Sequence, residues 1–302
     1  MAIHDCVSDA QPVVSQMRDI YIARGSGLGD VLMLAGAAKA ISARGFNVHL
    51  GTMPEFEPLL RLCPHIASIN TGYCGWYKCL DDCLYGIAGV HQTDAYLKAL
   101  GVEEPDPEMK RIELRPDINA QTAIEPLVHG PHLAVLHPAL TDPNRTWPMA
   151  HWQRLADLLK ESGYTVVQIG RDGHNKGAHT LNGVVQATNL LSLTETLEMI
   201  RASEVFISTD SGPVQLAGAT KTRMVVIYSS VDGRHRIPFG SNAAIVQAPC
   251  AMAGCYRFMH EPSIWQEHVK PDLNDTFQFW CPAKDNYGCL GRVTPEMVMS
   301  AI

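Results

Sequence analysis

Residues 19–32 read DIYIARGSGLGDVL, and this stretch decides the fold. The run from Asp19 to Arg24 is short and rich in β-branched residues, as a buried strand requires, and a glycine-rich turn follows it. The Ala- and Leu-rich segment after the turn extends to Gly45 and predicts a helix. A strand, a tight loop and a helix in this order begin a βαβ unit, which places the strand in a parallel sheet.

The alternation of strand-like and helical segments continues through the chain and is interrupted once. Residues 116–131 contain prolines and few periodic apolar positions, so we interpret them as a linker, with the domain boundary near residue 128. The predicted domains are therefore 1–128 and 129–302, and the second ends in a cysteine-containing extension. Before the linker we expect strands at 47–52, 65–70 and 111–115 and helices at 56–62 and 92–100; after it we expect strands at 132–139, 165–170, 184–187, 205–209 and 224–228 and helices at 149–161, 193–202 and 212–219.

Two doubly wound α/β domains with parallel sheets are the simplest architecture for this pattern. A length of 302 residues also favours two domains over one. Ligands of open parallel sheets bind at the carboxyl ends of the strands, so two facing sheets place an active site in the cleft between them. Functional residues are therefore expected in loops that follow strands.

Composition and charge exclude several classes of protein. Hydrophobic residues make up 46% and charged residues 18% of the chain, which excludes a disordered or fibrous protein. The formal net charge of -7 disfavours non-specific binding to nucleic acid or to an anionic membrane. No apolar run is long enough to cross a bilayer, and the first 18 residues lack the apolar core of a signal peptide. We therefore expect a cytoplasmic protein, whose oligomeric state the sequence leaves open.

The glycine-rich turn predicts an anion site at the start of a helix. Gly27 and Gly29 allow a ligand to approach the backbone, and the following helix offers unpaired N–H groups and a positive dipole end. A dinucleotide fingerprint would need glycine where the chain has Asp30, so a nicotinamide cofactor is disfavoured. The dipole stabilises the charge of Asp30, which makes this carboxylate the candidate general base for an acceptor hydroxyl. Aspartate is also a favoured helix cap, and that structural role is the alternative.

Loops after strands in the second half carry residues that could bind the diphosphate and the ribose of a nucleotide ligand. Arg145, in the loop that begins at Thr141, could stabilise a leaving diphosphate by bonding two oxygens at once; simple solvation is the alternative. Asp172 follows the strand at 165–170, where an acidic side chain could accept hydrogen bonds from ribose hydroxyls. A second anion site, with a simple N-cap as the alternative, is predicted where a helix opens after the strand at 205–209; its residues are Thr209, Asp210, Ser211 and Gly212, followed by Pro213.

These motifs, in this order, resemble one family, the ADP-heptose:lipopolysaccharide heptosyltransferases of glycosyltransferase family 9, which have the GT-B fold. RGSGLGDVL at 24–32 looks like the family's Arg-x-Ser-x-Leu/Met-Gly-Asp-Val opening, whose aspartate is the proposed catalytic base, here Asp30. RTWPMAHW at 145–152 is similar to its Lys/Arg-x-Trp-Pro segment, whose cation binds donor phosphate, here Arg145. STDSGPVQLA at 208–217 resembles its Asp-Ser/Thr-Gly-x-x-His-Leu-Ala segment, which carries phosphate-binding backbone groups.

The resemblance implies two Rossmann-like domains that face a central cleft, and inverting transfer of a sugar from a nucleotide-diphosphate donor to an acceptor hydroxyl. In this family the sugar is heptose and the donor is ADP-heptose or a similar nucleotide sugar. The chain departs from the family at Gln215, where histidine is usual, and this position belongs to the predicted donor site. No cofactor is required for the chemistry, because a fixed cation and helix dipoles can stabilise the leaving group. The acceptor remains open between a lipopolysaccharide core, a protein side chain and a small molecule.

Nine cysteines in a chain without an export signal favour thiols or metal ligands over a disulfide framework. Cys250, Cys255, Cys281 and Cys289 offer four thiolates for a closed tetrahedral site. Related autotransporter heptosyltransferases carry a C-terminal four-cysteine iron site, so the resemblance implies structural iron or zinc here; buried thiols without a metal are the alternative. A second group, which we interpret as part of the core, consists of Cys74, Cys79 and Cys83, with His91 as a further candidate ligand.

Two other functions remain open at this point. A nucleotide-sugar epimerase or hydrolase would use the same fold but would alter the free sugar without an acceptor. A non-catalytic nucleotide-sugar-binding module would keep the phosphate loops and would tolerate the loss of Asp30. Because fold alone does not settle function, the geometry of the site has to separate these alternatives.

Overall fold

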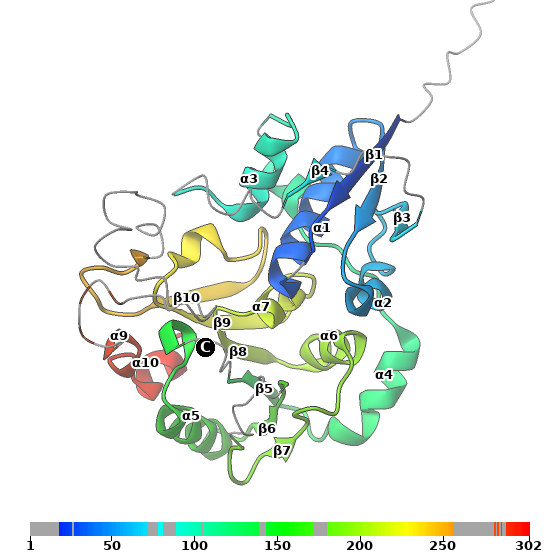
Figure 1. Cartoon of the computed structure of the whole chain (residues 1–302). Helices are drawn as coiled ribbons and strands as arrows, with labels where there is room; N and C mark the ends of the chain where they lie inside the picture. Colours follow the sequence, from blue (N-terminus) through cyan, green and yellow to red (C-terminus); the bar gives the residue numbers. More distant parts are fainter. Residues whose placement is uncertain are drawn as a thin grey trace, which may run out of the picture.

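The computed structural model describes residues 18–25, 27–71, 78–80, 89–103, 105–138, 143–171, 180–255, 281, 283, 285 and 288–302. These residues form two lobes, each built around one parallel sheet (Figure 1). Within the described ranges, no helix combines the length and apolar character needed to span a bilayer.

The N-terminal lobe contains a four-stranded parallel sheet. Strand β1 (Arg18–Ala23) lies between β2 (Phe46–Gly51) and β4 (Lys78–Cys79), and β3 (Ser68–Ile69) continues the sheet beyond β2. The glycine-rich turn leads from β1 into α1 (Leu28–Ser42), which is apolar on nearly all sides and is buried along most of its length. The strand–turn–helix unit predicted from residues 19–32 is therefore confirmed.

The C-terminal lobe contains a six-stranded parallel sheet in the order β10-β9-β8-β5-β6-β7. This order changes direction between β5 and β8, which is the crevice where ligands of doubly wound sheets bind. The predicted fold class, two doubly wound parallel α/β units, is confirmed. The strands are β5 (Leu133–His137), β6 (Thr165–Gln168), β7 (Val185–Gln186), β8 (Val205–Thr209), β9 (Arg223–Tyr228) and β10 (Ala243–Gln247).

Helices cover both sheets and also join the two lobes. In the larger hydrophobic cluster, buried side chains of α1 pack together with those of α6 and α7, so the lobes share apolar contacts. Near the end of the chain, α10 packs against α5 (Figure 1). The helices are α2 (Glu57–Leu60), α3 (Gln92–Ala99), α4 (Ile118–Ile124), α5 (Met149–Glu161), α6 (Leu193–Ala202), α7 (Gly212–Ala217), α9 (Gly288–Gly291) and α10 (Pro295–Met299).

Several elements differ from the sequence prediction. Residues 111–115 are extended but join no described sheet, because Ile112 and Leu114 bury themselves between the lobes and the Leu114 carbonyl accepts from Arg201 instead of a strand. The predicted linker contains α4, and β4, β10, α9 and α10 were not predicted. The boundary near residue 128 stays a prediction.

The tryptophan of the RTWP segment belongs to the core of the C-terminal lobe. Trp147 and Trp152 are fully buried, and their rings meet edge to face with centroids 4.9 Å apart. The Trp147 indole N–H donates to the carbonyl of Val293 at 2.9 Å, which ties the segment before α10 to the start of α5. Within this motif, the Trp147 indole therefore stabilises the core, and the candidate cation Arg145 lies two residues before it.

Candidate active site between the lobes

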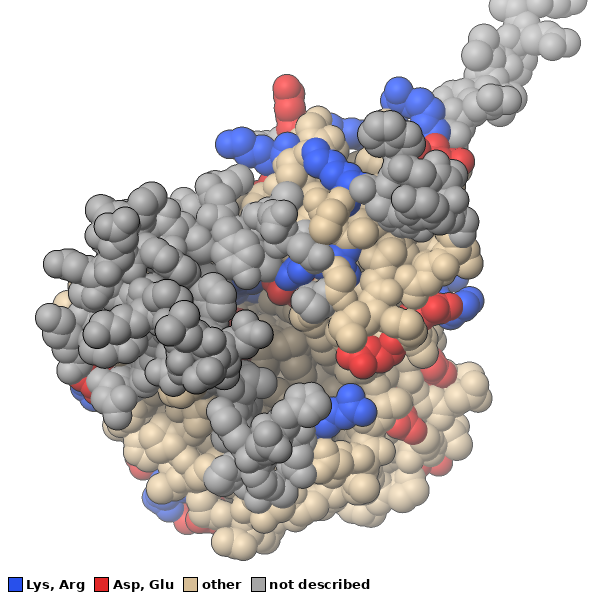
Figure 2. Space-filling view, viewed as in Figure 1, with Lys and Arg blue, Asp and Glu red and all other residues tan. Residues whose placement is uncertain are grey.

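The amino ends of α1 and α7 face each other across the junction of the lobes. A Cβ placed on Gly29, in the first turn of α1, would lie 3.5 Å from the Cα of Gly212, the first residue of α7. Neither helix receives a side-chain hydrogen bond from its N-cap residue, Gly27 or Ser211. The space-filling view shows this face of the molecule hollowed between the lobes, with basic side chains at the rim (Figure 2). Two positive helix ends therefore converge on one place.

Glycine is required at Gly27 and Gly212 for different reasons. Gly27 has a φ of 82°, in the left-handed region, and a Cβ there would lie 2.6 Å from Oδ2 of Asp30. A Cβ on Gly212 would meet Cβ of Leu28 at 3.0 Å, which is too close for an ordinary contact. The glycines thus keep the Asp30 carboxylate in place and let the two lobes approach.

Asp30 lies in the first turn of α1 and forms ion pairs with one arginine from each lobe. Its Oδ2 is 3.0 Å from Nη2 of Arg24, and its Oδ1 is 3.3 Å from Nη1 of Arg236. The Asp30 side chain is 21% exposed, so solvent and ligands can reach the carboxylate. Two guanidinium groups therefore hold the candidate base at the centre of the interlobe junction.

Arg24 is fixed on its other side by a buried tyrosine. Its Nε donates to the hydroxyl of Tyr96 at 3.2 Å, and Tyr96 comes from α3. Burial, and secondarily the charge of Asp30, raise the pKa of Tyr96 well above its ordinary value, so the hydroxyl stays protonated. Arg24 is thus a buried cation with a fixed orientation toward Asp30.

Gln215, predicted in the donor site, is buried on α7 and supports the loop that carries Arg236. Its Nε2 donates to the carbonyl of Arg236 at 2.7 Å, while its Oε1 has no hydrogen-bond partner among the described residues. Its Cγ would lie 3.6 Å from a Cβ on Gly29, so the side chain also reaches the opposite lobe. The donor-binding role of Gln215 stays a prediction, and its observed contact is with the Arg236 loop.

His137 ends β5 at the switch point and was not identified from the sequence. Its Nδ1 is 3.0 Å from the hydroxyl of Ser208 and 3.3 Å from that of Ser211, and the two hydroxyls are 2.9 Å apart. Burial lowers the pKa of His137 to about 4, so the ring is neutral near pH 7. Ser211 therefore bonds to Ser208 and His137 instead of capping α7. Beside it, Thr209 has a buried hydroxyl without a hydrogen-bond partner in the part of the chain that the structure describes.

The other predicted site residues differ in how well they are placed. Arg145 ends a 3-10 turn after β5, and its neighbour Asn144 donates to Ser230 at 3.0 Å, which holds the turn near the end of β9. Asp210 follows β8 as predicted. Thr141 and Asp172 lie outside the described residues, so their predicted roles stay predictions.

The four C-terminal cysteines lie within electrostatic reach of one another. Burial, followed by the neighbouring Cys281, Cys289 and Cys250, raises the pKa of Cys255 to about 12. Cys281 donates to Oδ1 of Asp285 at 3.1 Å. Even so, no set of three or more histidine, cysteine or acidic side chains in the described ranges is arranged to hold a metal ion. None of the described cysteines is in a disulfide; Cys74 and Cys83 lie outside the described residues, and Cys79 is exposed rather than part of the core.

His91 connects α3 to the loop that carries Arg236. Its Nδ1 accepts from the Thr93 N–H at 3.1 Å and its Nε2 is 2.9 Å from the carbonyl of Ile237, so the ring is neutral with its proton on Nε2. Burial lowers the pKa of His91 to about 4, although the nearby Asp94 opposes the shift. This neutral histidine joins the N-terminal lobe to the loop after the 3-10 turn at Gly233–His235.

Because the folded state holds His91 neutral, acid should weaken the fold. The unfolded chain binds a proton at its ordinary pKa of 6.5 and the folded chain at about 4, so stability is full above pH 6.5 and falls as the pH drops. We expect wild type to lose about 2 kcal/mol more unfolding free energy between pH 7 and pH 5 than His91→Gln. Urea unfolding of both proteins at the two pH values measures this difference. Equal losses in the two proteins would contradict it.

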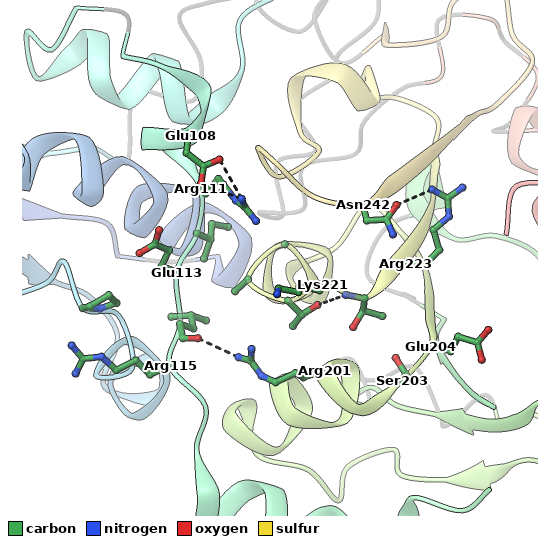
Figure 3. Close-up of a pocket in the computed structure, with 17 residues that line it drawn as sticks. Glu108, Arg111, Glu113, Arg115, Arg201, Ser203, Glu204, Lys221, Arg223 and Asn242 are labelled. Atoms are coloured by element: carbon green, nitrogen blue, oxygen red, sulfur yellow. Dashed lines mark hydrogen bonds and ion pairs between the residues drawn. The ribbon is translucent and has the colours of Figure 1, made fainter. Parts of the chain in front are cut away.

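A second groove between the lobes has a volume of about 890 Å³ (Figure 3). Its walls come from residues 108–115 and from the amino ends of β8 and β9, at Glu204 and Arg223. None of the residues predicted to act on a donor lines it. Because ligands of doubly wound sheets bind at the carboxyl ends, we place the candidate active site at the junction around Asp30 and not in this groove.

Comparisons with known proteins identify a family for this chain. The sequence model of glycosyltransferase family 9 (heptosyltransferase) matches residues 90–260, more than half of the chain. The chain is 22% identical to the autotransporter heptosyltransferase Aah of Escherichia coli over 231 residues, which cover 72% of this chain and 52% of that protein. It therefore spans about half the length of the curated relative it matches.

Solved structures show the same fold. A glycosyltransferase family 9 protein from Veillonella parvula superposes with a TM-score of 0.72 at 12% identity, covering 95% of this chain and 96% of that one. TibC, an iron-containing dodecameric glycosyltransferase of enterotoxigenic E. coli, superposes with a TM-score of 0.68 at 18% identity, covering 95% and 75%. One structure of TibC is a complex with ADP-D-beta-D-heptose.

Proposed function

The chain belongs to glycosyltransferase family 9, the heptosyltransferase family, and from that premise we propose that it transfers a sugar from a nucleotide-diphosphate donor to an acceptor hydroxyl. The observation that carries the proposal is the carboxylate of Asp30 at the meeting point of two helix amino ends, one from each lobe. We propose ADP-heptose as the donor, because TibC has been solved with ADP-D-beta-D-heptose. The acceptor is a hydroxyl of a lipopolysaccharide core, a protein or a small molecule.

In the proposed reaction, Asp30 removes the proton of the acceptor hydroxyl. The hydroxyl oxygen attacks the anomeric carbon from the face opposite the diphosphate, the bond to the diphosphate breaks, and the configuration inverts. Asp30 suits this role because it lies in the first turn of α1 and remains accessible at 21% exposure. The proton stays on Asp30. The new bond between the acceptor oxygen and the anomeric carbon forms as the bond to the diphosphate breaks, and the departing diphosphate carries the negative charge.

The leaving diphosphate gains negative charge, and the proposal assigns several groups to it. Arg145 supplies a guanidinium, and Ser211 and Gly212 supply backbone N–H groups at the amino end of α7, which has no side-chain cap from Ser211. A guanidinium bonds two oxygens at once and needs no proton transfer to do so. The further proposed donor contacts, carried over from the sequence, are Gly27, Gly29, Thr141, Asp172, Thr209, Asp210 and Gln215.

A donor screen tests this function. The protein is incubated with ADP-heptose and with other nucleotide sugars, with and without candidate acceptors, and nucleoside-diphosphate release and product are both measured. We expect acceptor-dependent ADP release and an inverted anomeric centre in the product. Acceptor-independent conversion of the donor would instead establish the epimerase or hydrolase alternative. Donor binding without any conversion would establish the binding module.

We propose the cytoplasm as the compartment of the reaction. None of the described cysteines is in a disulfide, which suits a reducing compartment. Nucleic acid is not a proposed partner, because the chain carries a formal net charge of -7.

We further propose that Cys250, Cys255, Cys281 and Cys289 hold a structural iron or zinc ion. The residue types suit either metal, because thiolates are ligands for both. These thiols lie within electrostatic reach of one another in a partly buried position, although in the described ranges they are not gathered around one point. The structural relative TibC contains iron. A bound metal would supply cross-linking between the loop after β10 and the segment before α10, and no step of sugar transfer passes through it.

Elemental analysis tests the metal site. We expect about one equivalent of iron or zinc per chain in protein purified under reducing conditions. Cys281→Ser should lose the metal and lower the thermal midpoint, whereas Cys79→Ser, at an exposed cysteine outside this group, should keep both. A metal content far below one equivalent in the wild-type protein, or full retention by Cys281→Ser, would contradict the assignment.

A further inference from the structure

Asp30 has two cationic partners, and they differ in how firmly they are held. Arg24 comes from the same lobe, has a side chain only 5% exposed, and is fixed by its bond to Tyr96. Arg236 comes from the other lobe, has a side chain 19% exposed, and makes the longer contact, at 3.3 Å against 3.0 Å. Arg236 is therefore the partner that can be exchanged.

The backbone at Arg236 is held from both lobes although its side chain reaches across the junction. The Arg236 carbonyl accepts from Gln215 on α7, and the next carbonyl, of Ile237, bonds to His91 at the start of α3. The ring of Phe239 lies against His91, with centroids 4.2 Å apart. The guanidinium can therefore change partner by side-chain rotation, without movement of its Cα.

Both oxygens of the Asp30 carboxylate are engaged by guanidinium groups, Oδ2 by Arg24 and Oδ1 by Arg236. An acceptor hydroxyl has to donate a hydrogen bond to one of these oxygens before its proton can be transferred, so it competes with the arginine that occupies that oxygen. Oδ1 of Asp30 becomes accessible to an acceptor hydroxyl once Arg236 has left it. A diphosphate is a suitable competitor, because a guanidinium bonds phosphate oxygens bidentately and strongly.

We propose that Arg236 is a positioning residue that pairs with Asp30 before the donor binds and turns to the donor diphosphate afterwards. The inference rests on the proposed function, which places the diphosphate between the amino ends of α1 and α7. Asp30 is one residue from the Gly29–Gly212 approach, so the guanidinium beside it lies close to that position. Donor binding then exposes the base, and an empty cleft keeps Asp30 engaged.

A double-mutant cycle in ADP affinity tests this exchange. The dissociation constant of ADP is measured by calorimetry for wild type, Asp30→Asn, Arg236→Met and the double variant. Asp30→Asn releases Arg236, so we expect ADP to bind about tenfold more tightly than to wild type. In the Arg236→Met background the same change should alter the affinity by less than about twofold.

A matched control comes from the same loop. Arg234 is paired with Asp232, and its side chain is 78% exposed. In the Arg234→Met background, Asp30→Asn should still tighten ADP binding about tenfold. If Arg236→Met lowers the unfolding midpoint, Arg236→Gln provides the same comparison with a polar side chain.

The outcomes separate this inference from the proposed function. Equal tightening by Asp30→Asn with and without Arg236 would overturn it, because Asp30 would then repel ADP through its charge alone. Absence of ADP binding in both wild type and Asp30→Asn would overturn it as well. Energetic coupling without any acceptor-dependent transfer would support the exchange and remove the proposed reaction. Acceptor-dependent transfer without energetic coupling would support the proposed reaction and overturn the exchange.

Discussion

Asp30→Asn should lower the turnover number for sugar transfer by about 100- to 10,000-fold, the usual contribution of a general base. Asparagine keeps the size of the side chain and can still accept a hydrogen bond from Arg24, but it cannot take a proton from an acceptor hydroxyl. ADP should still bind, because the donor-binding groups remain. The measurement is the rate of acceptor-dependent ADP release at saturating donor, together with ADP affinity by calorimetry.

The control is an aspartate outside the junction. Asp157 lies on α5 with a side chain 39% exposed and pairs with Lys160, so Asp157→Asn should transfer sugar at close to the wild-type rate. Transfer by Asp30→Asn at a rate similar to this control would end the assignment of Asp30 as base. In that case the carboxylate would be a bridge between Arg24 and Arg236 and nothing more.

Asp30 was predictable because every signal for it is local. The strand before it, the glycines beside it and the helix after it all lie within residues 19–42, and the structure forms each of them. The same holds for the loop at 209–212, which follows a buried strand and opens α7 as predicted. Local sequence therefore determined the position of both helix ends, but not that they face each other.

Arg236 could not be predicted because its partner is distant in the sequence. The ion pair with Asp30 joins positions 206 residues apart, and a loop containing several basic residues gives no reason to choose one of them. Helix α4 was missed for a similar reason, since Glu198 of α6 binds both the backbone at Asp117 and the side chain of Gln121. Such tertiary contacts override a weak local pattern.

His137 was only partly predictable from the sequence. Its position directly after a predicted strand was visible in the sequence, and functional residues were expected at such positions. What the sequence did not reveal is the cluster with Ser208 and Ser211, which depends on the pairing of β5 with β8. Contacts between site residues on neighbouring strands therefore cannot be predicted until the strand order of the sheet is known.

Gly212→Val should lower transfer by about 100-fold or more, since small misplacements of catalytic groups have effects of that size. The added Cβ would meet Leu28 at 3.0 Å, and the branched side chain would project toward the amino end of α1. The lobes would have to separate, which moves Asp30 away from the groups on α7. Donor affinity and turnover should both fall, because the contact at Gly212 positions both the α1 end that carries Asp30 and the α7 end that is proposed to bind the diphosphate.

Gly291→Val is the matched change, because a Cβ at Gly291 would meet nothing within 4 Å and the residue is far from the predicted donor loops in sequence. We expect it to keep wild-type ADP affinity and turnover, with only a small change in stability. Urea unfolding of both variants separates a loss of fold from a loss of alignment. A Gly212→Val protein that unfolds like wild type but still transfers sugar at full rate would mean that the close approach of α1 and α7 is not the arrangement in which the reaction occurs. That measurement therefore tests whether the two helix ends act together, because they meet at Gly212.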